Sequence, residues 1–249
     1  MSPESIKGYL LTKSWRDTAD GIELEYWFSS DQGPLQVIFQ NVESVFFLAR
    51  DELDIAEPLV RNLIGTSIRD LQLQNFSMNP VVGIYCLSYR SARQLSDKLL
   101  KAGLNPLESD INPADRYLSE RFITSAAIVS GSPGQRSQYL RFVNPIVKST
   151  DYSPSLRYVS LDIECSTERL QLYSIAVLGR DSTNIDQKVF MLGEGATQNY
   201  AVTCSTQREL LQRFLDWLKD FDPDVVVGWN VIAFDYDYLQ KVADSIGQR

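Results

Sequence analysis

The chain has 249 residues and a formal net charge of −8, because 32 acidic side chains outnumber 24 Lys and Arg and there is no histidine. This length accommodates one large domain or two of ordinary size, and the 44% of hydrophobic residues exclude a mostly disordered chain. The lack of histidine excludes Ser-His-Asp and Cys-His nucleophiles and histidine-bound zinc or haem, so any catalysis must use carboxylates, hydroxyls, amines or oxygen-bound metal ions.

The cysteines and the apolar runs indicate where the protein works. Cys86, Cys165 and Cys204 are odd in number, far apart and without a Cys-x-x-Cys pair. A disulfide framework or a structural zinc site is therefore not expected, which favours a reducing compartment. The N-terminus lacks the apolar core of a signal peptide, and no apolar run approaches the roughly 20 residues that span a bilayer. We expect a soluble, cytoplasmic protein with no membrane partner.

The first third of the chain predicts an antiparallel meander followed by a small α/β unit. The expected strands of the meander cover residues 6–14, 22–30, 35–40 and 45–48. The expected elements of the α/β unit are a helix at 51–63, a strand at 81–89, a helix at 91–102 and a strand at 107–111. Gly103 stands where a helix commonly ends in a left-handed residue.

A further helix and two strands complete the first part. Asn112 and Pro113 are suited to the N-cap and first position of a helix that we expect to reach residue 123. Strand-like runs follow at residues 126–134 and 137–147. The next stretch is polar and contains Pro154, so we place a boundary between a domain at residues 1–150 and a second at residues 151–249.

The second part has the pattern of an α/β fold with a mixed sheet. The expected elements are strands at residues 157–165, 170–178 and 188–192, a helix at 207–219, a strand at 225–228 and a helix at 231–246. The strand at residues 225–228 is wholly apolar before its glycine, which is typical of a strand buried on both faces. In open α/β sheets, sites gather at the carboxyl ends of strands, so the residues that follow the strands are of most interest.

Two carboxylates share one face of the strand at residues 157–165. Asp162 and Glu164 are two positions apart, so their side chains point to the same side and start about 7 Å from each other. Such a pair is suited to hard cations, and two Mg²⁺ about 4 Å apart are a common device for phosphodiester hydrolysis. A chain of this composition contains about one Asp-x-Glu by chance, so surface residues remain the alternative.

A second polar group follows the strand at residues 225–228. Asn230 is suited to cap the next helix, and Asp235 then lies about one turn into that helix. Phe234 is suited to a core position, and for Asp235 the alternative is a solvated helix residue. The spacing Asn-x-x-x-Phe-Asp is far rarer by chance than Asp-x-Glu, so it adds weight to a site that both elements share.

These motifs together resemble a known family. Asp162-Ile163-Glu164 on a strand, followed by Gly-Trp-Asn-x-x-x-Phe-Asp-x-x-Tyr-Leu from Gly228, is similar to the first two exonuclease motifs of family B DNA polymerases. Residues 107–123 resemble the segment that ends the N-terminal domain in this family. Residues 8–12 and 15–17 resemble the start of its bacterial members, so the likeness covers essentially the whole chain.

The resemblance implies a fold and a function. The fold would be α+β to α/β: a β-rich N-terminal domain with a small α/β unit, followed by an incomplete ribonuclease-H-like 3′→5′ exonuclease domain with a mixed sheet. Asp162, Glu164 and Asp235 would be catalytic ligands of two Mg²⁺ or Mn²⁺ ions. Asn230 and Phe234 would lie beside the frayed primer end. The parent protein would be a DNA-directed DNA polymerase that proofreads during DNA replication and repair.

The implied partners are the single-stranded 3′ end of primer DNA, template DNA and the remainder of the polymerase chain. A sliding clamp, bound through a missing C-terminus, is a further implied partner. One departure from the family matters: its third exonuclease motif, Tyr-x-x-x-Asp, does not follow Asp235, and the polymerase motifs are absent. We therefore expect an N-terminal fragment, cut inside its exonuclease domain and weakly active or inactive, because site residues act as a unit.

Two other functions remain open at this point. One is a non-catalytic nucleic-acid-binding or scaffolding module, for which the basic residues before the boundary are candidate phosphate contacts or plain surface charges: Arg116, Arg121, Arg136, Arg141 and Lys148. The other is a standalone small nuclease. The native reading frame tests the standalone nuclease, since we expect the frame of a polymerase to continue past Arg249 and to contain Tyr-x-x-x-Asp within about a hundred residues. Mn²⁺ binding to wild type and to an Asp162→Ala, Glu164→Ala variant tests the scaffolding module.

Overall fold

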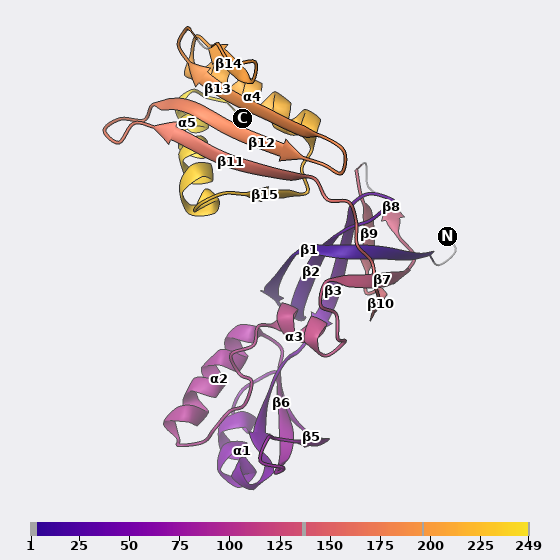
Figure 1. Cartoon of the computed structure of the whole chain (residues 1–249). Coiled ribbons are helices and arrows are strands. Elements are labelled where there is room, and N and C mark those ends of the chain that lie inside the picture. Colours follow the sequence, from indigo (N-terminus) through magenta and orange to yellow (C-terminus); the bar gives the residue numbers. More distant parts are fainter. Residues whose placement is uncertain (1–3, 136–137, 196, 249) are drawn as a thin grey trace. The chain divides into compact units, whose positions relative to one another are not determined.

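The structure is a computed structural model that describes residues 4–135, 138–195 and 197–248 (Figure 1). The chain divides into two compact units, Met1–Pro154 and Ser155–Arg249, which are treated separately below. The first unit is β-rich, and the second contains one mixed sheet with helices. Within the described ranges, no helix is long and apolar enough to cross a membrane.

The first unit is built on a seven-stranded sheet in the order β10-β7-β1-β2-β3-β9-β8. Its strands are β1 (Glu4–Thr18), β2 (Gly21–Ser29), β3 (Leu35–Val42), β7 (Ala126–Gly131), β8 (Gly134–Gln135), β9 (Leu140–Val143) and β10 (Ile146–Ser149). β1 to β3 form the predicted antiparallel meander, but the fourth strand expected in it, at residues 45–48, belongs to a separate three-stranded sheet. Only the β3–β9 pair in the seven-stranded sheet is parallel among the described strands. The run predicted at 137–147 is broken into β9 and β10.

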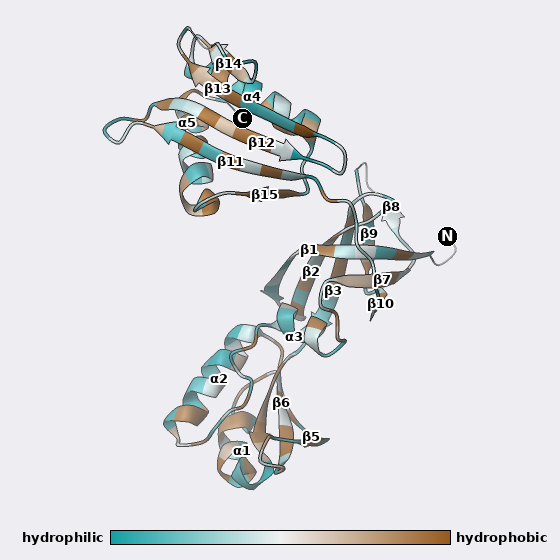
Figure 2. Ribbon diagram, in the orientation of Figure 1, coloured by the Kyte–Doolittle hydropathy of each residue, from teal (hydrophilic) through white to brown (hydrophobic). Residues whose placement is uncertain are grey.

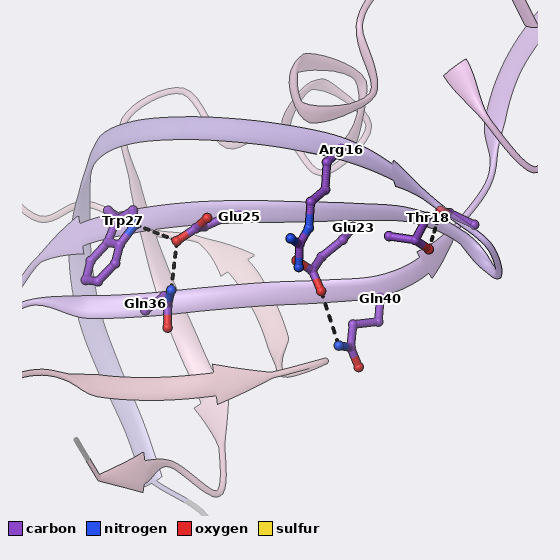
Figure 3. A network of polar contacts seen from close by, with 8 residues as sticks. Arg16, Thr18, Glu23, Glu25, Trp27, Gln36 and Gln40 are labelled. Atoms are coloured by element: carbon purple, nitrogen blue, oxygen red, sulfur yellow. Dashed lines mark hydrogen bonds and ion pairs between the residues drawn. The ribbon is translucent and has the colours of Figure 1, made fainter. Parts of the chain in front are cut away.

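The two faces of the meander differ because side chains alternate along each strand. The inner face holds a core that includes Tyr26, Phe28 and Phe142, and α3 (Pro113–Ser119) packs against it. On the outer face, Glu25 accepts hydrogen bonds from the Trp27 indole at 2.8 Å and from the Gln36 amide at 2.7 Å (Figure 3). The bond from Gln36 links β3 to β2 beside the backbone ladder, and the bond from Trp27 lies within β2.

Helix α3 begins as the sequence predicts. Asn112 is its N-cap, and the Asn112 side chain accepts a hydrogen bond from the Asp115 backbone N–H at 2.9 Å. The helix ends at Ser119, earlier than predicted, and the chain turns through Phe122, whose φ of 53° lies in the left-handed region.

The α/β unit inserted after β3 has a three-stranded sheet in the order β4-β6-β5. Its elements are β4 (Ser44–Ala49), η1 (Arg50–Glu52), α1 (Leu53–Arg61), β5 (Thr66–Gln74), β6 (Pro80–Cys86) and α2 (Tyr89–Lys101). Gly103 has a φ of +82° and ends α2 as predicted. Leu104 then donates its backbone N–H to the Leu99 carbonyl at 3.0 Å.

Three predictions for this unit are wrong. The sequence analysis missed β5, and it extended β6 through Leu87 to Tyr89, where Ser88 instead caps α2. The strand predicted at 107–111 does not form: Leu107 alone makes an antiparallel bridge, with Phe47. Phe47 and Leu107 exchange both backbone hydrogen bonds, at 3.0 and 2.8 Å, so the chain entering the unit lies beside the chain leaving it.

The second unit has a five-stranded mixed sheet in the order β14-β13-β12-β11-β15. Its elements are β11 (Tyr158–Cys165), β12 (Leu172–Arg180), β13 (Ile185–Leu192), β14 (Ala201–Cys204), α4 (Gln207–Phe221), β15 (Val225–Val227), η2 (Val231–Asp235) and α5 (Tyr236–Ser245). β11 to β13 are antiparallel neighbours, whereas the outer pairs β13–β14 and β11–β15 are parallel. Figure 2 shows apolar and polar residues alternating along β11 and β12. α4 and α5 contribute to the core on the apolar side.

The edges of this sheet differ from the prediction. The sequence analysis missed β14, and it expected β15 to be buried on both faces. Instead β15 is an edge strand, and Val227 is 47% exposed. An all-valine run shows that a strand is apolar, but it does not show how many neighbours the strand has. The last predicted helix also divides, since the π-helical turn η2 precedes α5.

Thr206 caps α4, which gives a first testable expectation. Its hydroxyl accepts a hydrogen bond from the Glu209 backbone N–H at 3.1 Å, and the Glu209 carboxylate accepts one from the Ser205 N–H at 2.8 Å. We expect Thr206→Ala to destabilise α4 by about 1 kcal/mol, because the Glu209 backbone N–H in the first turn loses its ordered partner. Hydrogen exchange of the α4 amides measures this, and Thr206→Ser is the control that should retain protection. Equal protection in both variants would contradict the role of the cap.

Candidate functional site

β11 carries the first pair of candidate residues as predicted. Asp162 and Glu164 are exposed on one face, while Leu161 and Ile163 are buried on the other. The strand is held by β12 along its length and by β15 beside its first half. The pairing with β12 shifts register between Glu164 and Cys165, so the strand ends in an irregularity next to Glu164.

Gly228 brings the second element close to β11. β15 runs parallel to β11 and pairs Val227 with Ser160, so the chain after β15 continues toward the Asp162 end of β11. A Cβ atom built on Gly228 would lie 2.5 Å from the Leu161 carbonyl oxygen, which is closer than such atoms approach. Only glycine fits this contact without movement of one backbone.

Asn230 then turns the chain into η2. It has φ 62° and ψ 28°, a left-handed conformation that asparagine adopts more readily than most residues. Its carbonyl accepts a hydrogen bond from the Phe234 N–H at 2.9 Å, but its side chain makes no capping bond, so the predicted side-chain cap is wrong. Phe234 is 46% exposed, which contradicts the core position considered for it.

Asp235 is the buried acid of this unit. The residue is only 2% exposed, although its neighbours in η2 are not buried. Burial raises the pKa of its carboxyl, and the charge of Asp162 raises that pKa further, while hydrogen bonds from the backbone of Asp235 and Ile163 oppose the rise. The fold therefore makes Asp162 and Asp235 neighbours, from a strand and from the start of a helix.

The charges around these carboxylates suit a cation. Among the described residues, no Lys or Arg forms an ion pair with Asp162, Glu164 or Asp235. A buried carboxylate beside a second one is costly unless a positive charge compensates it, and carboxylate oxygens are the ligands that Mg²⁺ and Mn²⁺ prefer. In the same described ranges, however, no three acidic or thiol side chains are gathered closely enough to hold a metal ion.

Other residues of the site were not predicted. The Ile163 backbone and Gly228 act through the main chain, and only the glycine after an apolar strand was a visible signal. Tyr238 binds the loop that follows β11, with its hydroxyl 2.9 Å from the Gln171 nitrogen. The motif that starts at Gly228 includes this tyrosine and not Tyr236, but the sequence analysis predicted no role for it in the site.

Two of the candidate basic residues of the first unit have partners within the fold. Arg116 is buried, and its guanidinium binds the Glu108 carboxylate and the Glu108 carbonyl, each at 3.0 Å. The guanidinium of Arg121 lies over the Tyr117 ring at 3.5 Å. Arg136 lies outside the described residues. Arg116 is therefore an interior cation with a partner, and its loss would leave the Glu108 carboxylate without this ion pair.

Family models match almost the whole chain. The model for the exonuclease domain of DNA polymerase family B matches residues 108–248. The models for the N-terminal domain and the insertion domain of DNA polymerase II match residues 8–41 and 44–104. The exonuclease match thus begins ahead of the boundary expected near residue 150, whereas the division into compact units falls after Pro154.

Individual relatives give the same result. DNA polymerase II of Escherichia coli K12 is 36% identical over 243 residues, which cover 95% of this chain and 30% of that protein. A DNA polymerase of Archaeoglobus fulgidus is 24% identical over 263 residues, covering 97% and 31%. The solved family B DNA polymerase of Pyrobaculum calidifontis superposes with a TM-score of 0.71 at 19% identity, covering 98% of this chain and 33% of the other. This chain spans about a third of the length of these relatives, and it belongs to family B of the DNA polymerases.

Proposed function

We propose that the second unit carries the metal-binding side of a 3′→5′ proofreading exonuclease, with Asp162, Glu164 and Asp235 as ligands. The observation that carries this proposal is the burial of Asp235 beside Asp162 with no compensating cation among the described residues. Two carboxylates contributed by different elements at one end of a mixed sheet are suited to a divalent ion. Glu164 adds a third carboxylate, on the same face of β11 as Asp162.

The chemistry follows from the donor set. Two divalent ions bound here would activate a water and stabilise the leaving oxygen of a DNA phosphodiester. The backbone would hold the ligands in place. β11 is paired with a strand on each side, and the absence of a Cβ at Gly228 lets the Asn230 turn lie close to β11. Asp235 enters from the start of α5, so the ligands come from elements that are stiffer than loops.

Asn230 and Phe234 are proposed to contact the single-stranded 3′ end of primer DNA. Both are exposed, and both belong to the turn that leads to Asp235. An exposed aromatic ring stacks on any base, which is what a proofreader requires, because it must accept every terminal nucleotide. The Phe234 ring is 6.3 Å from the Tyr238 ring, so it has an aromatic support on one side.

For the whole protein we propose a DNA-directed DNA polymerase that works on template and primer in the cytoplasm, with a sliding clamp as a further partner. The first unit, near residues 1–150, would be the scaffold beside the template, and residues 151–249 would belong to the exonuclease domain. The chain contains no Tyr-x-x-x-Asp after Asp235, so we expect weak hydrolysis or none from this chain alone. A non-catalytic nucleic-acid-binding module remains the alternative.

Metal binding separates the two proposals. We expect Mn²⁺ to bind the wild-type chain, as followed by loss of the free-ion signal in electron paramagnetic resonance. The double variant Asp162→Asn, Glu164→Gln should bind at least about tenfold more weakly, because it removes two charged ligands. The control is Asp237→Asn, since Asp237 is exposed and already paired with Lys241 at 2.6 Å. Equal Mn²⁺ affinity in wild type and double variant would favour the non-catalytic module.

A further inference from the structure

The Tyr238 hydroxyl is bound within the loop that joins β11 to β12. It accepts a hydrogen bond from the Gln171 backbone N–H at 2.9 Å. It lies 3.1 Å from the Gln171 carbonyl and 3.3 Å from the Arg169 carbonyl, so its own proton is donated to one of them. The Tyr238 hydroxyl therefore binds the loop backbone at Gln171 and Arg169 as both an acceptor and a donor.

This loop already folds on itself. Ser166 donates its N–H to the Gln171 carbonyl at 2.8 Å, and the Gln171 N–H is shared between the Tyr238 hydroxyl and the Arg169 carbonyl, which lies 2.8 Å from the nitrogen. The loop starts directly after the irregular end of β11, where the pairing with β12 shifts between Glu164 and Cys165. The Cys165 thiol lies beside the Tyr238 hydroxyl. The hydroxyl therefore contacts the segment that holds Glu164 in place.

The other end of the same side chain belongs to α5. Tyr238 lies three residues after Asp235, about one helical turn, so the backbone that carries Tyr238 is the backbone that positions Asp235. One side chain thus joins the two elements whose carboxylates form the proposed site. Among the described residues, the other contacts of α5 with the core are apolar and centre on Leu239 and Val242. Directly after the helix, the Ile246 carbonyl accepts a hydrogen bond from the Arg208 guanidinium.

We propose that Tyr238 is a positioning residue of the metal site: its hydroxyl ties the end of β11 to the start of α5 and so sets Glu164 relative to Asp235. This inference rests on the proposed function. Metal ligands held by a shared outer hydrogen bond are better placed than ligands held by packing alone, and loss of such bonds commonly weakens metal affinity by about 10- to 100-fold.

The test uses the whole chain and Mn²⁺ as the probe. Tyr238→Phe keeps the ring and removes only the hydroxyl. We expect Mn²⁺ affinity about tenfold below that of wild type, together with faster amide exchange at Gln171. Tyr236→Phe is the matched control, because Tyr236 is on the same helix and its hydroxyl makes no hydrogen bond within the described part of the chain. It should bind Mn²⁺ like wild type.

The outcomes separate this inference from the proposed function. If the Asp162, Glu164 double variant loses Mn²⁺ while Tyr238→Phe retains wild-type affinity, the positioning role is wrong and the metal site stands. If wild type itself binds no Mn²⁺, or the double variant binds as well as wild type, both are overturned. A loss in Tyr238→Phe that Tyr236→Phe shares equally also overturns the role, because it would reflect general loosening of α5.

Discussion

Replacement of Asp235 by asparagine should remove metal binding and at the same time stabilise the metal-free fold at neutral pH. Asp235 is buried and its carboxyl has a raised pKa, because burial and the charge of Asp162 both disfavour ionisation. An amide of nearly the same shape can still accept the backbone hydrogen bonds without carrying the charge. The expected loss of Mn²⁺ affinity is at least about tenfold, since a direct ligand disappears.

The pH dependence gives this prediction a second measurement. Because the pKa of the Asp235 carboxyl is higher in the folded than in the unfolded chain, its stabilising contribution is complete below the unfolded pKa. The contribution is lost as pH rises through the folded pKa, so metal-free wild type should gain protection of its β11 and α5 amides on acidification toward that range. Asp235→Asn should lack this gain.

The control for both measurements is Asp237→Asn, an exposed position two residues further along the same chain segment. It should leave Mn²⁺ affinity and the pH dependence unchanged. If Asp235→Asn bound Mn²⁺ normally, Asp235 would not be a ligand. If it instead lowered amide protection at neutral pH, the carboxylate would have a stabilising partner that the present geometry does not contain.

Gly228→Ala should have the second large effect. The added Cβ would meet the Leu161 carbonyl oxygen at 2.5 Å, and neither atom belongs to a flexible side chain. β15 and the Asn230 turn must then move away from β11, at a cost of about 1–3 kcal/mol typical of overpacking. The same movement separates Asp235 from Asp162, so Mn²⁺ affinity should fall together with the protection of the β11 amides.

Gly134→Ala is the matched control, because the nearest atom to its added Cβ is a carbonyl oxygen at an ordinary 3.7 Å. It should change neither quantity. Wild-type amide protection along β11 in Gly228→Ala would show that the two backbones are not packed as closely as described. Reduced protection with unchanged metal binding would show that the turn does not position Asp235.

Much of the fold was predictable because strong local patterns coincide with tertiary burial. The alternation along β11 and the caps at Asn112 and Gly103 are local signals, and all three are confirmed. β5 was missed because its sequence, TSIRDLQLQ, mixes charged and amide residues and its strand lies at a sheet edge. Residues 107–111 were wrongly predicted as a strand because a single bridge to Phe47 satisfies that backbone instead.

The site was predictable in its residues and less so in its geometry. Alternation alone places Asp162 and Glu164 on one face, whereas the proximity of Asp162 and Asp235 depends on which strand lies next to β11. The left-handed turn at Asn230 and the Tyr238 contact depend on tertiary packing as well. No periodicity in one dimension specifies such contacts.

The paired backbones of Phe47 and Leu107 explain how a whole α/β unit can be inserted between strands of the seven-stranded sheet. The segment that matches the insertion domain, residues 44–104, follows β3 directly. Its two ends are adjacent, because Phe47 near its start is paired with Leu107 just after its end. A segment whose two ends are already adjacent adds little closure entropy to the sheet, whatever its length. Replacement of the chain between Phe47 and Leu107 by a short turn should therefore leave the seven-stranded sheet folded, and amide protection along β1 to β3 measures this.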